Sequence, residues 1–204
     1  MKIFLVRHGQ TAWNVAGRWQ GSTDIPLDEI GQQQAQRLAE KMATYKLNAI
    51  YSSPLQRAAA TAQGVADKFS LPIIFRRDLE EIRLGEWEGH TVQEIIAKHP
   101  CHYDKWENHP QEKFDPNIET HYELQQRAWK AFDEICQIET GNTLIVTHGA
   151  WINRLICKLT DTPLQYRMDF PVSNVGINIV KCIKDGDIRN YDVLTLNDIS
   201  HLDL

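Results

Sequence analysis

The chain of 204 residues lacks long hydrophobic runs, an excess of positive charge and closely paired cysteines. No stretch approaches the roughly 18 consecutive apolar residues of a membrane span. The net charge of −5 argues against a nucleic-acid-binding surface. The four cysteines form no Cys-x-x-Cys pair, and the N-terminus shows none of the features of a signal peptide. We therefore expect a cytoplasmic protein with free thiols and no membrane or nucleic-acid partner.

Predicted strands and helices alternate along most of the chain. Apolar runs predict strands at residues 2–6, 48–52, 72–75 and 143–147. Apolar spacing and capping residues predict helices over 28–45, from Ser53-Pro54 onward, from the capping box Thr120-His121-Tyr122-Glu123 onward, and after the strand 143–147. Shorter helices are predicted near 91–98 and 103–108, within a less regular section. Two last strands, roughly 175–183 and 188–196, flank an Asp185-Gly186 turn.

This order of elements predicts an α/β protein. Strands that alternate with helices favour three α/β/α layers around a mostly parallel sheet, to which the late hairpin adds an antiparallel edge. The hairpin is either an exposed edge that pairs in a homodimer or an edge that is covered.

Histidines and arginines stand where predicted strands end. The strand 2–6 runs into Arg7-His8-Gly9, the strand 143–147 runs into His148-Gly149, and Arg57 lies in the first turn of a predicted helix. Ligands of such sheets bind at the carboxyl ends of the strands. We therefore expect one pocket that holds two arginines and two histidines.

These residue types fit phosphoryl chemistry. Two guanidinium groups in one pocket repel each other unless an anion lies between them, and their geometry matches phosphate oxygens. A neutral imidazole beside bound phosphate can attack phosphorus and form a phosphohistidine, and nearby arginines keep it neutral. The second imidazole can donate a hydrogen bond to the phosphate oxygens. The leaving alkoxide needs a carboxylic acid, for which the spacing leaves four candidates: Glu80, Glu81, Glu86 and Glu88.

The segment "LVRHGQTAWN" is similar to the signature of the histidine phosphatase, or cofactor-dependent phosphoglycerate mutase, superfamily. Five further blocks occur in the order of that family: "GRWQGSTDIPLDEIGQQQAQRLA", "IYSSPLQRAAATA", "LEEIRLGEWEGHT", "LIVTHGAWIN" and "DTPL". The chain most resembles the small bacterial broad-specificity phosphatases of that superfamily. The resemblance implies a phosphoglycerate mutase-like fold, with residues 1–204 as one domain and a lid at about 86–118.

The resemblance also implies roles for individual residues. It makes His8 the nucleophile and Glu81 the acid, with Arg7, Arg57, His148 and the amide of Asn14 around the phosphate. The remaining phosphate- and substrate-binding positions that it implies are Gln10, Thr11, Gln20, Gly21 and Gly149. No metal and no cofactor are expected. Ile118 replaces a glycine of close relatives, a departure that bears on the loop over the pocket and on substrate choice.

We expect a metal-independent phosphomonoesterase that acts on small phosphorylated metabolites. A mutase is the first alternative, but mutases of this family carry paired arginines in a longer insertion, and residues 86–118 contain no arginine. The segment instead contains Trp87, Tyr103, Trp106 and Phe114. A phosphate-binding sensor without turnover is the second alternative, and the intact catalytic set argues against it. The cluster at residues 99–104 (His99, Cys101, His102, Asp104) lacks a partner pair with metal-ligand spacing and is expected to be a solvated loop.

Overall fold

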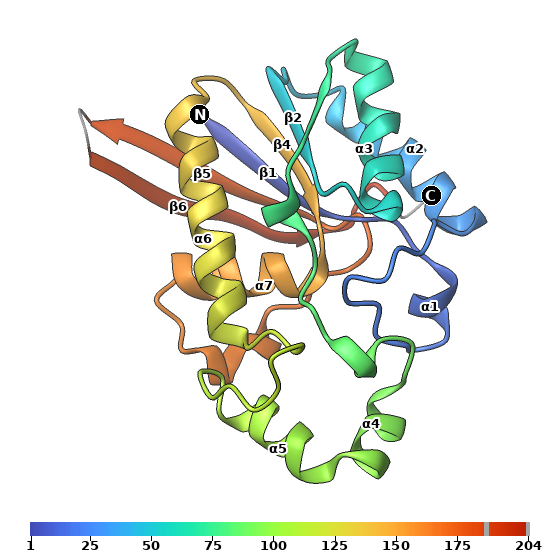
Figure 1. The fold of residues 1–204 in the computed structure, drawn as a ribbon. Helices are drawn as coiled ribbons and strands as arrows, with labels where there is room; N and C mark the ends of the chain where they lie inside the picture. Colours follow the sequence, from blue (N-terminus) through green and yellow to red (C-terminus); the bar gives the residue numbers. More distant parts are fainter. Residues whose placement is uncertain (186–187, 203–204) are drawn as a thin grey trace.

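A six-stranded sheet in the order β3-β2-β4-β1-β5-β6 forms the centre of the computed structural model, which describes residues 1–185 and 188–202 (Figure 1). The strands are β1 (Lys2–Arg7), β2 (Ala49–Ser52), β3 (Ile73–Phe75), β4 (Thr143–Thr147), β5 (Ile177–Asp185) and β6 (Ile188–Asp198). The first four strands of that order are parallel, and β5 and β6 are antiparallel. The predicted α/β fold is therefore confirmed. Gly186, in the predicted turn, lies outside the described residues.

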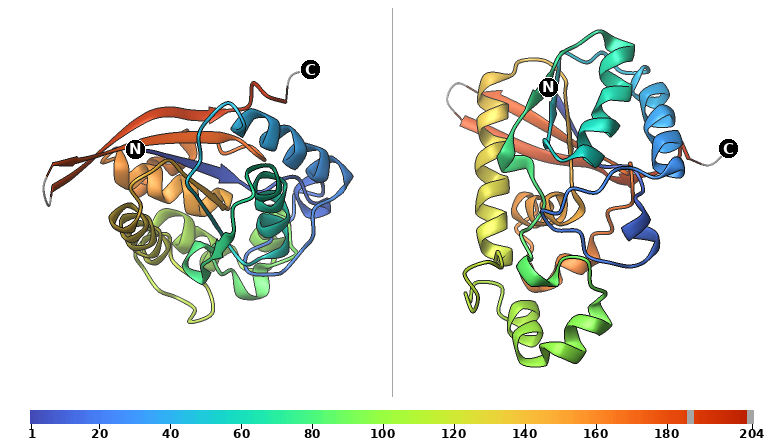
Figure 2. Two further views of the ribbon diagram at one scale, coloured as in Figure 1. Left: turned by 90° about the horizontal axis from the view of Figure 1, so that it is seen from above. Right: turned by 45° about the vertical axis from the view of Figure 1, so that its right-hand side comes forward.

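Helices cover both faces of the sheet, as the two views of Figure 2 show. One face packs against α2 (Glu29–Met42) and α3 (Gln56–Phe69), and the other against α6 (His121–Ile138) and α7 (Gly149–Leu159). Successive side chains of a strand point to opposite faces. Phe4 therefore enters the core beneath α2 and α3, whereas Leu5 enters the core beneath α6 and α7.

A lid made of short elements lies beyond one end of the sheet, where α4 and α5 stand at the bottom of Figure 1. It contains η2 (Gly85–Trp87), α4 (Val92–Lys98) and α5 (Pro100–Asn108). The loop after α1 (Ala12–Val15) joins it through a bridge between Arg18 and Thr91. The remaining short elements are η1 (Arg77–Leu79) and η3 (Leu164–Asp169). The lid lies over the ends of the strands that carry the predicted site.

Two predicted helix starts differ from the structure. The helix expected from Ser53-Pro54 begins at Gln56, because the Ser53 hydroxyl lies 2.8 Å from Nε2 of His148 and accepts a hydrogen bond from the amide of Leu55 rather than capping a helix. The helix expected at 103–108 begins earlier, at Pro100, because proline suits the first turn of a helix, where no amide donor is needed.

The pairing register of β1 with β4 brings the predicted site residues together. Arg7 of β1 pairs with Thr147 of β4, so the next residues, His8 and His148, are neighbours. Ser52 of β2 pairs with Val146, which brings Ser53 beside them. Three strand ends therefore meet at one edge of the sheet.

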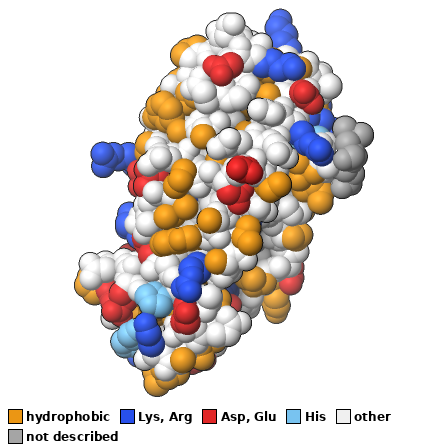
Figure 3. All heavy atoms as spheres, turned by 90° about the vertical axis from the view of Figure 1, so that its right-hand side faces the viewer, with side chains coloured by type: hydrophobic (Ala, Val, Ile, Leu, Met, Phe, Trp, Pro, Cys, Tyr) orange, Lys and Arg blue, Asp and Glu red, His pale blue; other side chains and the backbone are white. Residues whose placement is uncertain are grey.

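The surface is mixed in charge on the face shown in Figure 3, where acidic and basic side chains are scattered among apolar ones. All four cysteines are free, and three of them are buried. Among the described residues no helix has the length and apolar character needed to cross a bilayer. β6 is the edge strand of the sheet, with β5 as its neighbour, and pairing of that edge in a homodimer stays a prediction.

The backbone of α2 packs closely at Gly31 against the loop that follows His8. A Cβ on Gly31 would overlap the carbonyl oxygen of Gln10, whereas a Cβ on Gly64 of α3 would lie 3.3 Å from the carbonyl oxygen of Ala35. Both glycines lie inside helices, so alanine gains similar helix propensity at each. We expect Gly31→Ala to lower the free energy of unfolding by about 1–3 kcal/mol relative to Gly64→Ala, measured by urea denaturation. Equal stability of the two variants would contradict the close approach.

Candidate active site

His8 is buried at the end of β1, with its side chain 2 % exposed. Its Nδ1 lies 2.7 Å from the carbonyl oxygen of Gly9, which can only accept a hydrogen bond, so Nδ1 carries the proton and Nε2 presents a lone pair. Burial, and then the charges of Arg7 and Arg57, hold the pKa of His8 well below its ordinary 6.5. His8 is therefore a neutral imidazole with a nucleophilic nitrogen.

His148 lies beside His8, with the two ring centres 5.3 Å apart. Its Nε2 is 2.8 Å from the Ser53 hydroxyl, which already accepts from the amide of Leu55. The buried Nδ1 of His148 has no protein hydrogen-bond partner within the described structure. When Ser53 donates to Nε2, the ring proton stands on Nδ1, where it can be donated to an anion. Burial and then Arg57 keep the pKa of His148 low, so the ring is a neutral donor.

Arg7 and Arg57 supply the positive charge next to the two imidazoles. The guanidinium of Arg57 donates to the carbonyl oxygens of Thr23 and Gly21 at 2.7 and 2.8 Å, and that of Arg7 donates to Val172 at 2.7 Å. Carbonyl groups fix the direction of a guanidinium but do not neutralise it. In both arginines the buried Nε has no hydrogen-bond partner in the described part of the chain. This arrangement is suited to a doubly charged anion such as phosphate.

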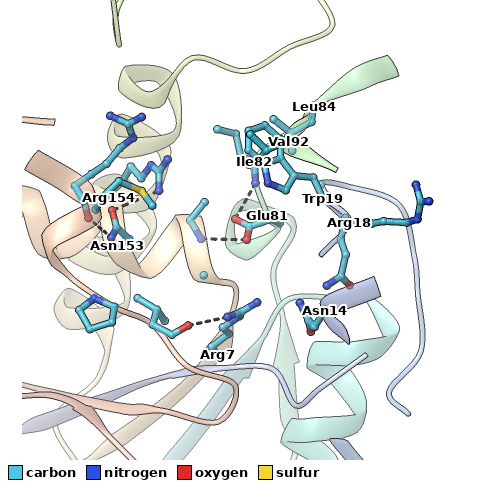
Figure 4. A pocket seen from close by; sticks show the side chains of 18 of the residues that line it. Arg7, Asn14, Arg18, Trp19, Glu81, Ile82, Leu84, Val92, Asn153 and Arg154 are labelled. Carbon is cyan, nitrogen blue, oxygen red and sulfur yellow. Dashed lines mark hydrogen bonds between the residues drawn. The ribbon is translucent and has the colours of Figure 1, made fainter. Parts of the chain in front are cut away.

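Glu81 lies in the loop that follows η1, and its carboxylate is held against the first turn of α7. Its carboxylate accepts hydrogen bonds from the amides of Ala150 and Trp151, at 3.1 and 3.2 Å, and from its neighbour Ile82 at 3.0 Å (Figure 4). The other three glutamates considered, Glu80, Glu86 and Glu88, do not line the cavity. Geometry therefore agrees with the choice of Glu81 that the family pattern implies.

The loop that carries Glu81 is held by a buried ion pair. Arg127 of α6 donates to the carbonyl oxygens of Asp78, Glu80 and Glu81, and it also binds both carboxylate oxygens of Glu119 at 2.8 and 2.9 Å. Glu119 is 2 % exposed and follows Ile118, which packs in the core rather than shaping an open loop. No sequence pattern marked the role of Arg127.

The structure brings most of the predicted site residues to one cavity of about 640 Å³. Those that line it are Arg7, His8, Asn14, Gln20, Gly21, Arg57, Glu81 and Gly149. The Asn14 oxygen accepts from Thr11 and Asn174, which leaves the amide nitrogen available as a donor. Asn174 also binds the carbonyl of His8 at 2.9 Å, a positioning contact that the sequence did not reveal.

Gln10, Thr11 and His148 are not among the lining residues, although His148 lies fully buried beside His8. The Gln10 side chain donates to Asp28 at 3.1 Å, and the Thr11 hydroxyl accepts from the amide of Asn14 as the N-cap of α1. Both side chains stabilise the loop that follows β1. Sequence order alone could not separate these contacts from contacts to a ligand.

The lid supplies the other wall of the cavity, and three arginines that no sequence pattern marked also line it: Arg18, Arg154 and Arg167. Trp19, Tyr103 and Trp106 contribute aromatic surface, and Arg154 and Arg167 contribute charge. Among the described residues, no group of three or more His, Cys, Asp or Glu side chains is arranged to hold a metal ion. The cavity therefore combines a basic end beside His8 with a wall that is partly aromatic.

The family relationship agrees with this geometry. Residues 3–195 match the model of the histidine phosphatase superfamily (branch 1), and the chain belongs to that superfamily. It is 30 % identical over 203 residues to phosphoserine phosphatase 1 of Hydrogenobacter thermophilus, covering 99 % of this chain and 94 % of the relative. It is 33 % identical over 192 residues to the phosphatase PhoE of Bacillus subtilis, covering 94 % of each.

Solved structures show the same likeness in three dimensions. YhfR of Bacillus stearothermophilus is 36 % identical and superposes with a TM-score of 0.89, covering 99 % of both chains. A phosphoserine phosphatase of Entamoeba histolytica, solved with phosphoserine, is 31 % identical with a TM-score of 0.87, covering 98 % of each chain. The fold is thus phosphoglycerate mutase-like, and the protein is a phosphatase of the phosphoglycerate mutase family.

Three buried imidazoles make the fold sensitive to acid. Burial lowers the pKa of His8, His121 and His148 well below 6.5, so the unfolded chain binds protons below pH 6.5 that the folded chain does not. We expect the free energy of unfolding to fall as pH decreases from 6.5, with a slope of up to about 1.4 kcal/mol per pH unit for each histidine. Urea denaturation at a series of pH values measures this.

Two variants, one at a buried and one at an exposed histidine, show how much a buried imidazole contributes to this pH dependence. His148→Asn removes one buried imidazole and should make the pH dependence shallower, whereas His102→Asn changes an exposed histidine and should leave it as in the wild type. Identical slopes in all three proteins would contradict the buried neutral state of His148.

Proposed function

We propose that the protein hydrolyses small phosphate monoesters through a phosphohistidine formed on His8. Nε2 of His8 attacks phosphorus, and the bond between phosphorus and the ester oxygen breaks. Glu81, as the carboxylic acid, gives its proton to the leaving alkoxide. The resulting carboxylate then takes a proton from water, which attacks phosphorus and breaks the N–P bond. Phosphate is released, and His8 and the acid form of Glu81 are restored.

The observation that carries this proposal is a set of three buried nitrogen atoms around His8. Nε of Arg7, Nε of Arg57 and Nδ1 of His148 have no protein partner in the described structure, although each is inaccessible to solvent. A buried donor without a partner costs free energy. A bound phosphoryl group would accept from all three and would place phosphorus against the lone pair of His8. The same donors are suited to the equatorial oxygens of the transition state.

The relatives support a small organic phosphate as the substrate. Two of them are named phosphoserine phosphatases, and the Entamoeba histolytica enzyme was solved with phosphoserine and with 3-phosphoglyceric acid. The cavity of about 640 Å³ is large enough for such a molecule. Hydrolysis rather than mutase chemistry is favoured by the lid, which contains no arginine.

Removal of the nucleophile is the first test. We expect His8→Ala to lower kcat for p-nitrophenyl phosphate by about 10⁴-fold or more, because the covalent step is lost. Wild-type protein quenched during turnover of a ³²P-labelled ester should retain label that is stable to base and lost in acid, as expected for an N–P bond. His102→Ala, at an exposed position, is the matched control.

Turnover that is unaffected by His8→Ala would refute the mechanism. Incubation with 3-phosphoglycerate and its bisphosphate primer distinguishes hydrolysis from mutase activity. Isomerisation that is faster than phosphate release would identify a mutase.

The role of Glu81 predicts a dependence on the leaving group. An alkoxide needs a proton as it leaves, whereas p-nitrophenolate is stable without one. In single-turnover measurements, we expect Glu81→Gln to slow phosphorylation of His8 by an alkyl phosphate by about 10²–10⁴-fold and by p-nitrophenyl phosphate by much less. Glu80→Gln, next in the chain but outside the cavity, is the control. Equal losses with both esters would exclude Glu81 as the general acid.

A further inference from the structure

Two buried arginines line the active-site cavity away from the proposed phosphate position. Arg154 lies in α7 and is 7 % exposed, and Arg167 lies in η3 and is 2 % exposed. Figure 4 shows Arg154 and Asn153 across the pocket from Arg18 and Trp19, with Glu81 between the two sides and Arg7 below. Neither Arg154 nor Arg167 is used by the hydrolytic mechanism.

Protein contacts satisfy these two guanidinium groups only in part. Nη2 of Arg154 lies 3.0 Å from Nδ1 of His121, and Nη1 lies 3.4 Å from the Asn153 oxygen. Arg167 donates to the carbonyl of Leu164 at 3.2 Å and lies 2.5 Å from a carboxylate oxygen of Glu107. The buried Nε atoms of both arginines have no hydrogen-bond partner in the described part of the structure.

Arg154 and Arg167, together with the neighbouring His121 and Glu107, carry one net positive charge. Burial, and then the repulsion of Arg167, lower the pKa of Arg154 to about 10, which keeps it charged at neutral pH. Burial and then Arg154 hold the pKa of His121 well below 6.5, so His121 is neutral. Glu107 offsets one of the two guanidinium charges. Glu81, whose charge also acts on Arg154, is held by the first turn of α7 and is the neutral acid in the proposed mechanism.

The position of the pair fits the leaving group of a short substrate. Gly149 lines the phosphate end at the start of α7, and Arg154 follows five residues later, about 8 Å along the helix axis. The Asn153 amide donates to the carbonyls of Arg167 and Phe170, which fastens η3 to α7 and fixes the two arginines relative to each other.

We propose that Arg154 and Arg167 bind a carboxylate on the leaving alcohol, so that the preferred substrates are small phosphorylated carboxylic acids. This inference rests on the proposed function, since the phosphate must occupy the His8 end. A carboxylate carries one negative charge and matches the one positive excess, whereas a second phosphate would bring nearly two. Guanidinium groups bind carboxylates with paired, charge-assisted hydrogen bonds.

Matched esters test the proposal. The first is 2-carboxyethyl phosphate, the second is propyl phosphate, which lacks the carboxylate, and the third is propane-1,3-diol bisphosphate, which carries a second phosphate instead. We expect the wild type to prefer the carboxylate ester to propyl phosphate by about 10- to 100-fold in kcat/KM, the range typical of hydrogen bonds to a charged group. Arg154→Met and Arg167→Met should each reduce that ratio by about tenfold or more.

Glu107→Gln is expected to change the ratio of the two kcat/KM values in the opposite direction from the arginine variants. It removes the competing carboxylate beside Arg167, so the preference for 2-carboxyethyl phosphate should rise. Arg77→Met, at an exposed arginine outside the cavity, should leave the ratio as in the wild type. Equal kcat/KM for the first two esters, a ratio that neither Arg154→Met nor Arg167→Met lowers, or a preference for the bisphosphate would each overturn the proposal.

Measurements of ester binding test the carboxylate site independently of the proposed hydrolysis. If none of the esters is hydrolysed, the hydrolytic proposal fails, and calorimetric titration of the His8→Ala protein with 2-carboxyethyl phosphate and propyl phosphate decides the carboxylate site. Tighter binding of the carboxylate ester that is lost in the His8→Ala, Arg154→Met double variant supports the site. Equal binding of the two esters overturns it.

Discussion

The parallel pairing of β1 with β4 is the interaction on which the active site depends. Because Arg7 is opposite Thr147, the two histidines that follow these residues meet at the same edge of the sheet. A slip of one residue would turn every side chain of β1 to the other face and would also exchange Phe4 and Leu5 between the two cores. Burial of these apolar side chains thus fixes the register, and the register fixes the distance between the imidazoles.

Buried positive charge is the second constraint, and the fold keeps that charge available. Arg7 and Arg57 are oriented by backbone carbonyls, which direct a guanidinium without cancelling its charge. Arg127 differs, because Glu119 binds it in a bidentate pair and it then anchors the loop of Glu81. In the proposed mechanism Arg7 and Arg57 bind the phosphate, whereas Arg127 supports a loop, and of these three guanidinium groups only that of Arg127 is hydrogen-bonded to a carboxylate.

Sequence patterns predicted the features that depend on neighbouring residues in the chain. They failed for residues whose contacts come from segments distant in the sequence. Thr120 caps its helix as expected, because capping depends only on nearby amides. Ser53 was predicted as a cap but contacts His148, which lies 95 positions later. Arg154 follows the apolar residue Ile152 by two positions in α7 and resembles an exposed residue in the sequence. It is buried because α6 and η3 pack over that side of α7, as the contact of Arg154 with His121 and the hydrogen bonds from Asn153 to the carbonyls of Arg167 and Phe170 show.

The lid connects the loop of Glu81, the proposed general acid, to the part of the cavity that contains Arg154. The indole of Trp106 donates to the carbonyl of Glu119 at 3.1 Å, and Glu119 holds Arg127, which binds the loop of Glu81. The same indole ring packs 3.9 Å, centre to centre, from His121, the neighbour of Arg154. A leaving group that contacts Trp106 and Arg154 would therefore rest on the residues that position the acid. If Glu81 is the acid, as proposed, such an arrangement would let binding energy from the remote part of a substrate hold Glu81 against the ester oxygen, and contacts distant from the reacting bond would then raise the rate of the chemical step.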